Sequence, residues 1–358
     1  MREIQMYPPK KRRPPDLVRK LQFTANGREL AAWVDQARRV SARGRTLVAV
    51  TNLYACDLAS GTGQLLEDEG LGDQWGETLS DPVLSPDGRY LVTEMRLNEH
   101  HENVLSVFDR HDPGAPLVPT TSIGFSGFFF TTDGAALVAV RNGQEYEDDA
   151  RDVARFELAK LTAPPTRFKE KVNPLTLQPM RVAVRNLKWK SLLARPPWLR
   201  ASTAALSADG RFLAVGDVQG VVHVTDLKKK AVIATLPPEK PALRYRVAER
   251  IALDPSAKWL VRLGGGRLFA RPLGEGKAWQ TKHSLGYAYD FAFHPTGRIL
   301  CAVFPDGQAR YFDPLTGAVR EAFRWGRKPL HAVAFSPDGL MCAAGGENGR
   351  VVLWDVDA

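Results

Sequence analysis

A short motif, in which an apolar residue precedes a polar turn and a glycine, recurs along the chain and constrains the fold more than any other feature. Clear copies end at Gly27, Gly88, Gly134, Gly210, Gly297 and Gly339, and a degenerate copy, LDPSA, ends at Ala257. The six intervals between these turns are 61, 46, 76, 47, 40 and 42 residues long. Four of them lie close to the forty-odd-residue period of a unit built from four short strands.

Short β-rich runs follow these turns, for example RYLVTEM, RFLAVGD and LMCAAGG. In the later copies a glycine-containing hairpin turn then leads into a third strand such as VVHVTD or VVLWD. A single unit of this kind cannot bury both of its faces, so the units are expected to stack around an axis. The sequence therefore predicts an all-β propeller that spans residues 1–358 as a single domain.

The glycines that close the repeated turns are expected to be structural residues. These turn glycines are Gly88, Gly134, Gly210, Gly297 and Gly339. At Gly88, Gly210 and Gly339 we expect a positive φ, which residues with a branched side chain rarely adopt.

The last unit contains FSPDG, GGENG and Trp354-Asp355, and at this spacing it resembles the WD40 family of seven-bladed β-propellers. The resemblance covers nearly all of residues 1–358. Other copies replace the tryptophan-aspartate pair by Cys56-Asp57, Phe108-Asp109, Thr225-Asp226 and Phe312-Asp313. The family's Gly-His dipeptide is absent, and His331 lies inside the strand of KPLHAVAF. The resemblance implies a seven-bladed fold that acts as a scaffold, and the alternative is a propeller of the six- to eight-bladed periplasmic type.

The final strand, which contains VVLWD at 351–355, lacks a partner on one side. In propellers of this family the outermost strand of the last blade often comes from the other end of the chain. REIQMY at 2–7 alternates polar and apolar residues and stops at Pro8-Pro9, as an edge strand does. We therefore predict that residues 2–7 pair with residues 351–355; a disordered basic tail is the alternative.

The net charge of +9 is concentrated in two segments. Residues 1–20 carry +5 and residues 166–200 carry +8, so the rest of the chain is acidic overall. We interpret 166–200 as a basic insertion between blades three and four. Its mixture of aromatic and basic residues suits an acidic protein surface, phosphate backbones or stacked bases. The predicted partner-binding residues are Lys188, Trp189, Lys190, Arg195, Trp198 and Arg200.

Two other interpretations of this insertion stay open. In the first, its aromatic side chains pack it onto the propeller as a brace and its charges face water. In the second, the acidic loop RNGQEYEDDARD at 141–152 neutralises the insertion within the molecule.

Motifs with catalytic or metal-binding chemistry are weak. Gly124-Phe125-Ser126-Gly127 lacks the spacing of a nucleophile elbow, and Gly264-Gly265-Gly266-Arg267 stands where sister repeats place a hairpin turn. Glu99-His100-His101-Glu102 lacks the i, i+4 histidine spacing of a helical zinc site. We therefore predict no catalytic residue, no metal site and no cofactor.

The cysteines and the hydrophobic runs indicate in which cellular compartment the protein is expected. Cys56, Cys301 and Cys342 are too few for a disulfide framework and are expected to be reduced and packed. No apolar run approaches the roughly 18 residues of a membrane span, and the first residues lack the apolar stretch of a secretory signal. We expect a cytoplasmic location.

The preferred function is a non-enzymatic protein-protein interaction scaffold that works as a subunit of a complex. One alternative is a nucleic-acid-associated propeller that uses the basic insertion and KKRR at 10–13. The others are a metal-dependent propeller hydrolase and a protein that binds an anionic membrane surface.

Overall fold

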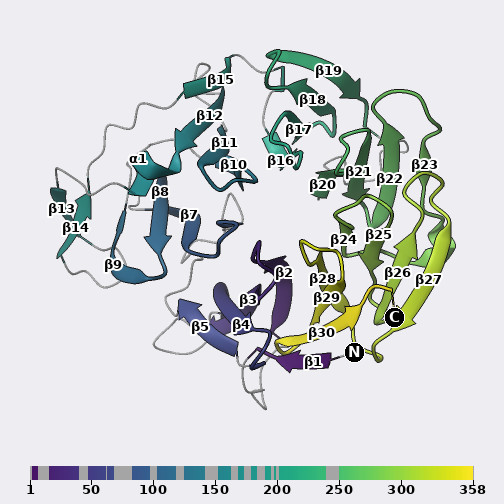
Figure 1. Ribbon diagram of the computed structural model, residues 1–358, viewed down its shortest axis with the longest axis horizontal. Coiled ribbons are helices and arrows are strands. Elements are labelled where there is room, and N and C mark those ends of the chain that lie inside the picture. The colour runs from purple at the N-terminus through teal and green to yellow at the C-terminus, as the bar shows by residue number, and fades with distance from the viewer. Residues whose placement is uncertain are drawn as a thin grey trace. The chain divides into compact units, whose positions relative to one another are not determined.

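The computed structural model of the chain is composed almost entirely of strands (Figure 1). It describes residues 2–6, 16–39, 47–61, 63–67, 83–96, 103–117, 125–141, 152–162, 168–172, 179–183, 190–194, 197–198, 201–238 and 250–357. The chain divides into two compact units, residues 1–77 with 249–358 and residues 78–248. The prediction of one domain over 1–358 stays a prediction.

The first unit holds four of the four-stranded antiparallel sheets found in the described residues. One sheet contains β2 (Leu17–Phe23), β3 (Glu29–Arg39), β4 (Leu47–Asp57) and β5 (Gly63–Glu67). The next contains β20 (Arg250–Leu253), β21 (Trp259–Gly264), β22 (Arg267–Pro272) and β23 (Trp279–Gln280), and is followed by the short 3-10 helix η1 (His283–Leu285). Then come β24 (Asp290–Phe293), β25 (Leu300–Val303), β26 (Gln308–Phe312) and β27 (Val319–Arg324). The last contains β28 (Leu330–Phe335), β29 (Met341–Gly346), β30 (Arg350–Asp355) and β1 (Arg2–Gln5).

The second unit holds three further four-stranded sheets within its described residues. The first contains β6 (Val83–Leu84), β7 (Tyr90–Arg96), β8 (Asn103–Asp109) and β9 (Asp112–Leu117). The next contains β10 (Phe125–Phe130), β11 (Ala136–Arg141), β12 (Asp152–Glu157) and β15 (Lys190–Ala194). The third contains β16 (Ala201–Leu206), β17 (Phe212–Asp217), β18 (Val222–Asp226) and β19 (Ala231–Leu236). The helix α1 (Leu158–Thr162) and the separate hairpin of β13 (Phe168–Val172) and β14 (Pro179–Ala183) complete it.

The predicted strand at the start of the chain is confirmed. β1 pairs antiparallel with β30, and Arg2 lies opposite Leu353 while Ile4 lies opposite Val351 (Figure 1). The side chain of Ile4 is 3% exposed, because the apolar side of β1 faces the core between this sheet and the sheet of β2 to β5. The strand therefore covers the edge of β30 that would otherwise be unpaired.

The repeated turns form as predicted. Gly88, Gly210 and Gly339 have φ values of +78°, +69° and +76°, and the other two turn glycines, Gly134 and Gly297, are also positive. In the last repeat the Ser336 hydroxyl donates to Asp338 Oδ1 at 2.5 Å and accepts from the Met341 amide at 2.9 Å. The motif recurs because serine, aspartate and glycine together satisfy one tight turn.

The three cysteines are buried and unbridged, as expected. Cys301 and Cys342 pack in one core cluster with Tyr311 and Trp354, between the last two sheets of the first unit. Burial raises the pKa of the Cys342 thiol, so the neutral form is favoured there.

The predicted position of the basic insertion is wrong in one respect. β15 at Lys190–Ala194 pairs with β12 and is the fourth strand of the third repeat's sheet, so residues 166–200 contribute to that sheet instead of following it. The segment pairs because Leu193 supplies a side chain to the core beside Val153. The hairpin of β13 and β14 therefore lies within the connection between the third and fourth strands.

No helix in the described part of the chain has the length and apolar character needed to cross a membrane.

Candidate functional site

Each sheet of the first unit has two ends with different kinds of turn. We call the end with the turns of the SPDG type the repeat-turn end. The other end carries the connections between second and third strands, which in the three C-terminal sheets are the turns at 264–267, 304–308 and 345–349. We call it the hairpin end.

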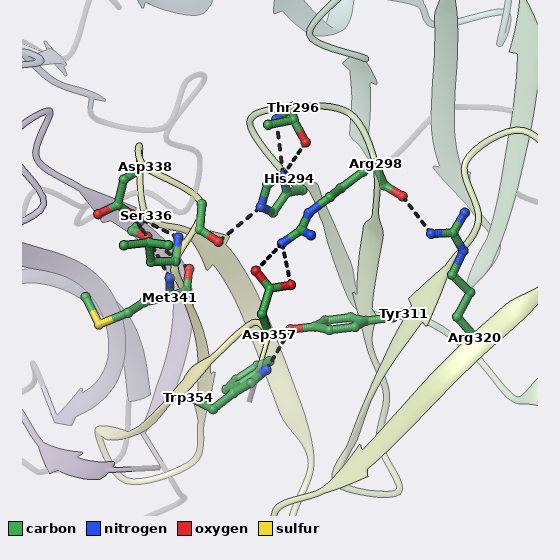
Figure 2. Close-up of polar contacts among 12 residues, drawn as sticks. His294, Thr296, Arg298, Tyr311, Arg320, Ser336, Asp338, Met341, Trp354 and Asp357 are labelled. Atoms are coloured by element: carbon green, nitrogen blue, oxygen red, sulfur yellow. Dashed lines mark hydrogen bonds and ion pairs between the residues drawn. The ribbon is translucent and has the colours of Figure 1, made fainter.

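At the repeat-turn end, polar side chains of one sheet contact side-chain and backbone groups of the next sheet (Figure 2). His294 Nδ1 lies 2.8 Å from the Thr296 hydroxyl, and its Nε2 lies 3.0 Å from the backbone oxygen of Gly339 in the next sheet. Arg298 donates to both carboxylate oxygens of Asp357, at 2.6 and 2.7 Å. The polar side chains of His294, Arg298 and Asp357 are thus already hydrogen-bonded within the protein, and we assign these contacts a structural role.

Below these contacts, Trp354 of the WD pair donates through Nε1 to the Tyr311 hydroxyl at 2.7 Å (Figure 2). Both side chains are buried, and the indole lies 5.1 Å from the Trp325 ring. Burial raises the pKa of Tyr311, so its hydroxyl stays protonated and available as an acceptor. The tryptophan of this repeat therefore holds two sheets together and does not face a partner.

At the hairpin end, the segment that enters β24 is fixed by backbone hydrogen bonds to two sheets. The Ala288 amide donates to the Gly266 oxygen at 2.7 Å, and the Tyr289 amide donates to the Val303 oxygen at 2.9 Å. The guanidinium of Arg310 also donates to the backbone oxygen of Leu285. Hydrogen bonds to two sheets therefore fix this segment, although it lies before the strand β24 and is not part of it.

Two large aromatic side chains project from this segment into solvent. Tyr287 is 59% exposed and Tyr289 is 45% exposed, whereas Ala288 between them is buried. This alternation places both tyrosines on the same side of the extended backbone. The Tyr289 ring stacks on the His331 ring of β28, with ring centroids 5.0 Å apart and an angle of 7° between the planes. We call Tyr287, Tyr289 and His331 the aromatic row.

Glycine is required beside the first member of the row. A Cβ atom on Gly266, whose φ is +71°, would lie 2.3 Å from Cδ1 of Tyr287. The glycine-rich turn at 264–267 is therefore a hairpin turn that supports a tyrosine, in agreement with the structural interpretation of that motif.

An ion pair between a buried carboxylate and a partly exposed arginine anchors the row to its neighbours. The Asp290 carboxylate accepts from the Arg250 guanidinium and, at 2.9 Å, from the backbone amide of Val333. These contacts link the first strands of three successive sheets, β20, β24 and β28. Burial raises the pKa of Asp290 and outweighs the opposing effect of Arg250. Burial also lowers the pKa of His331, so its imidazole is neutral near pH 7.

The predicted partner-binding residues lie elsewhere, in the second unit. Trp198 is fully buried in a core cluster with Val153, Leu193 and Leu213, so its prediction as an exposed interface anchor is wrong. The physical reason is that β15 brings the segment against the core of two sheets. The side chain of Lys190 in β15 is not described. Four residues lie outside the described residues, and their role in binding stays a prediction: Lys188, Trp189, Arg195 and Arg200.

Of the other sequence motifs, some lie outside the described residues and others form strands or turns. The histidine pair at 99–102 and the basic run at 10–13 lie outside the described residues, as does most of the acidic loop 141–152. Phe125–Phe130, which contains Ser126, forms the strand β10. Within the part of the chain that is described, no three histidine, cysteine or acidic side chains are grouped to hold a metal ion.

Sequence reasoning missed the aromatic row, because Tyr287 and Tyr289 belong to no motif and to no cluster of charge. Tyr289 and His331 each stand eight residues before the turn glycine of their repeat, Gly297 and Gly339. Alignment of the repeats on these glycines would have placed the two rings on equivalent positions of adjacent sheets. Tyr287 would then have followed from the alternation of an extended segment.

Comparisons with known proteins agree with this architecture. Residues 324–355 match the WD domain, G-beta repeat family. The serine-threonine kinase receptor-associated protein of Gallus gallus is 36% identical over 63 residues, which are 18% of this chain and 18% of that protein. The chain thus spans less than a fifth of that relative in this match. The crystal structure of the β-propeller domain of Myceliophteria thermophila Cps50 (Swd1) covers 94% of this chain and 96% of its own, with a TM-score of 0.58 and 14% identity.

The structural likeness concerns the fold, and the family match concerns one repeat. The matched repeat contains β28, β29 and β30, which end at the buried Trp354. The all-β propeller predicted from the sequence is confirmed, and residues 324–355 match a WD repeat.

Proposed function

We propose that this protein is a non-enzymatic scaffold that binds other proteins, and that the hairpin end of its three C-terminal sheets is a binding face. The observation that carries the proposal is the pair Tyr287 and Tyr289, which are exposed by 59% and 45% on a segment fixed by backbone hydrogen bonds. Tyrosine is enriched in the centres of protein interfaces, because it offers a large contact area and loses little conformational entropy. Here that entropy is already reduced by Gly266 and His331.

The experiment is affinity capture from extracts of the native host, with quantitative mass spectrometry. The wild type is compared with the double variant Tyr287→Ala/Tyr289→Ala. The matched control is Leu315→Ala/Leu340→Ala, because these leucines are 60% and 62% exposed at the repeat-turn end. Removal of two interface tyrosines should lower the recovery of specific partners by about tenfold or more, while the control retains them.

The thermal midpoints of all three proteins should agree, since none of the changed side chains is buried. Equal recovery of the same proteins by all three would refute the binding face. The cytoplasmic location expected from the sequence, and binding of nucleic acid through residues 166–200, stay predictions.

A further inference from the structure

Among the described residues, the exposed charged side chains around the aromatic row are all cations. Four exposed cations lie at the hairpin end of the three C-terminal sheets, on the segments next to the row: Lys282, Arg324, Arg327 and Lys328. A surface with this excess of positive charge attracts carboxylates or phosphates, and repels basic partners.

The carboxylates described at the same end are already engaged with cations. Asp306 accepts from Arg310 at 2.6 Å, and Glu347 lies 3.8 Å from Lys328. Asp290 is buried and bound to Arg250, as described above. Only one of the four exposed cations, Lys328, therefore has a carboxylate beside it among the described residues, and that carboxylate is at a long distance for an ion pair.

The geometry of the tyrosines favours a peptide over a nucleic acid. One face of Tyr289 is covered by His331, and one side of Tyr287 lies against the Gly266 backbone. Bases stack on free aromatic faces, whereas ring edges and hydroxyl groups suit apolar side chains and carboxylates. Residues i and i+2 of an extended chain also repeat at about 6.5 Å, which is the spacing of alternate side chains in an extended peptide.

We propose that the aromatic row and its flanking cations bind an acidic, extended segment of a partner protein. Apolar or aromatic side chains of that segment lie across Tyr287 and Tyr289, and its carboxylates face Arg327 and Lys328. This inference rests on the proposed function and adds the chemistry of the ligand.

The test is fluorescence anisotropy with three labelled probes at about 50 mM salt, where charge attraction between exposed groups is only partly screened. The probes are a peptide of six Glu-Tyr repeats, the same peptide with glutamine in place of glutamate, and an oligothymidylate of similar length. The acidic peptide should bind about tenfold or more tightly than the neutral peptide, and more tightly than the oligonucleotide. Tyr287→Ala/Tyr289→Ala and Arg327→Glu/Lys328→Glu should each weaken it by about tenfold, while Leu315→Ala/Leu340→Ala should not.

Equal binding of the two peptides would overturn the proposal. So would an affinity for the acidic peptide that is unchanged in both Tyr287→Ala/Tyr289→Ala and Arg327→Glu/Lys328→Glu. Tighter binding of the oligonucleotide, lost in the tyrosine variant, would assign the face to nucleic acid instead. The two levels of inference can fail separately. If captured partners depend on the tyrosines but the acidic peptide does not bind, the ligand chemistry is wrong and the scaffold function stands.

Discussion

Replacement of Ile4 by alanine tests whether β1 is an integral strand. The side chain is 3% exposed and packs in a core cluster with Val18, Val34 and Val351. The change removes three carbon atoms, which corresponds to roughly 2.4 kcal/mol of transfer free energy at about 0.8 kcal/mol each. The cavity left behind adds a further cost, so the free energy of unfolding should fall by about 3 to 4 kcal/mol.

Equilibrium unfolding in urea, followed by circular dichroism, measures this loss. With a slope of about 2 kcal/mol/M, the midpoint should move down by about 1.5 to 2 M, and the slope itself should not change. Unfolding of the first unit should show the shift, because β1 and all of its contacts in this cluster belong to that unit.

The matched control lies on the opposite side of the same strand. Glu3 is 52% exposed and its carboxylate lies 2.9 Å from Arg350 Nε. Loss of an exposed ion pair costs about 0 to 1 kcal/mol, so Glu3→Ala should be nearly neutral. If Ile4→Ala and Glu3→Ala unfold at the same urea concentration, β1 is not packed on the core, and the reasoning fails.

Two further predictions concern the turns and the ion pairs of the repeat. Gly339→Ala should lower the thermal midpoint more than Gly210→Ala does. A new Cβ at position 339 would lie 2.4 Å from His294 Nε2, whereas a new Cβ at position 210 would come no closer than 4.0 Å to any described atom. Equal losses in the midpoint would contradict this. Hydrogen bonding from Arg211 lowers the pKa of Asp226 from 3.8 to about 2. This pair therefore stabilises the folded state above pH 3.8 and loses its effect as the pH falls toward 2, so Arg211→Ala should flatten the pH dependence of the midpoint in that window.

The repeat could be predicted because each of its turns depends on residues that are close together in the sequence. The turn at Ser336 to Gly339 needs a hydroxyl, a carboxylate and a residue with positive φ within four positions. Each requirement selects a particular residue type, which can be recognised in the sequence. The pairing of β1 was also predictable, since an open strand edge demands a partner. The first prediction uses the conformational preferences of neighbouring residues, and the second uses the requirement that a strand edge be paired.

The candidate site was not predictable in the same way. Tyr287 and Trp198 are both aromatic, yet one is exposed on a fixed segment and the other is fully buried. The difference is that Trp198 packs in the core cluster that β15 joins through Leu193, whereas Tyr287 lies outside any core cluster of the described residues. Charge gave no signal for the site either, because the strongest concentration of positive charge is at 166–200, whereas the four cations of the site are scattered between 282 and 328. These cations gather only through the fold.

The pairing of Arg2 with Leu353 has a consequence for how the protein is made. β1 leaves the ribosome before the other described strands and β30 after them, so the sheet that joins them cannot form until residues 350–355 have been synthesised. Closing so long a loop costs entropy that grows with the logarithm of its length, and contacts this distant in sequence slow folding. Until then Ile4 and Met6 have no sheet to join, and the edge of β30 has no partner. The nascent chain therefore has an unpaired strand edge, which favours aggregation, until this sheet assembles.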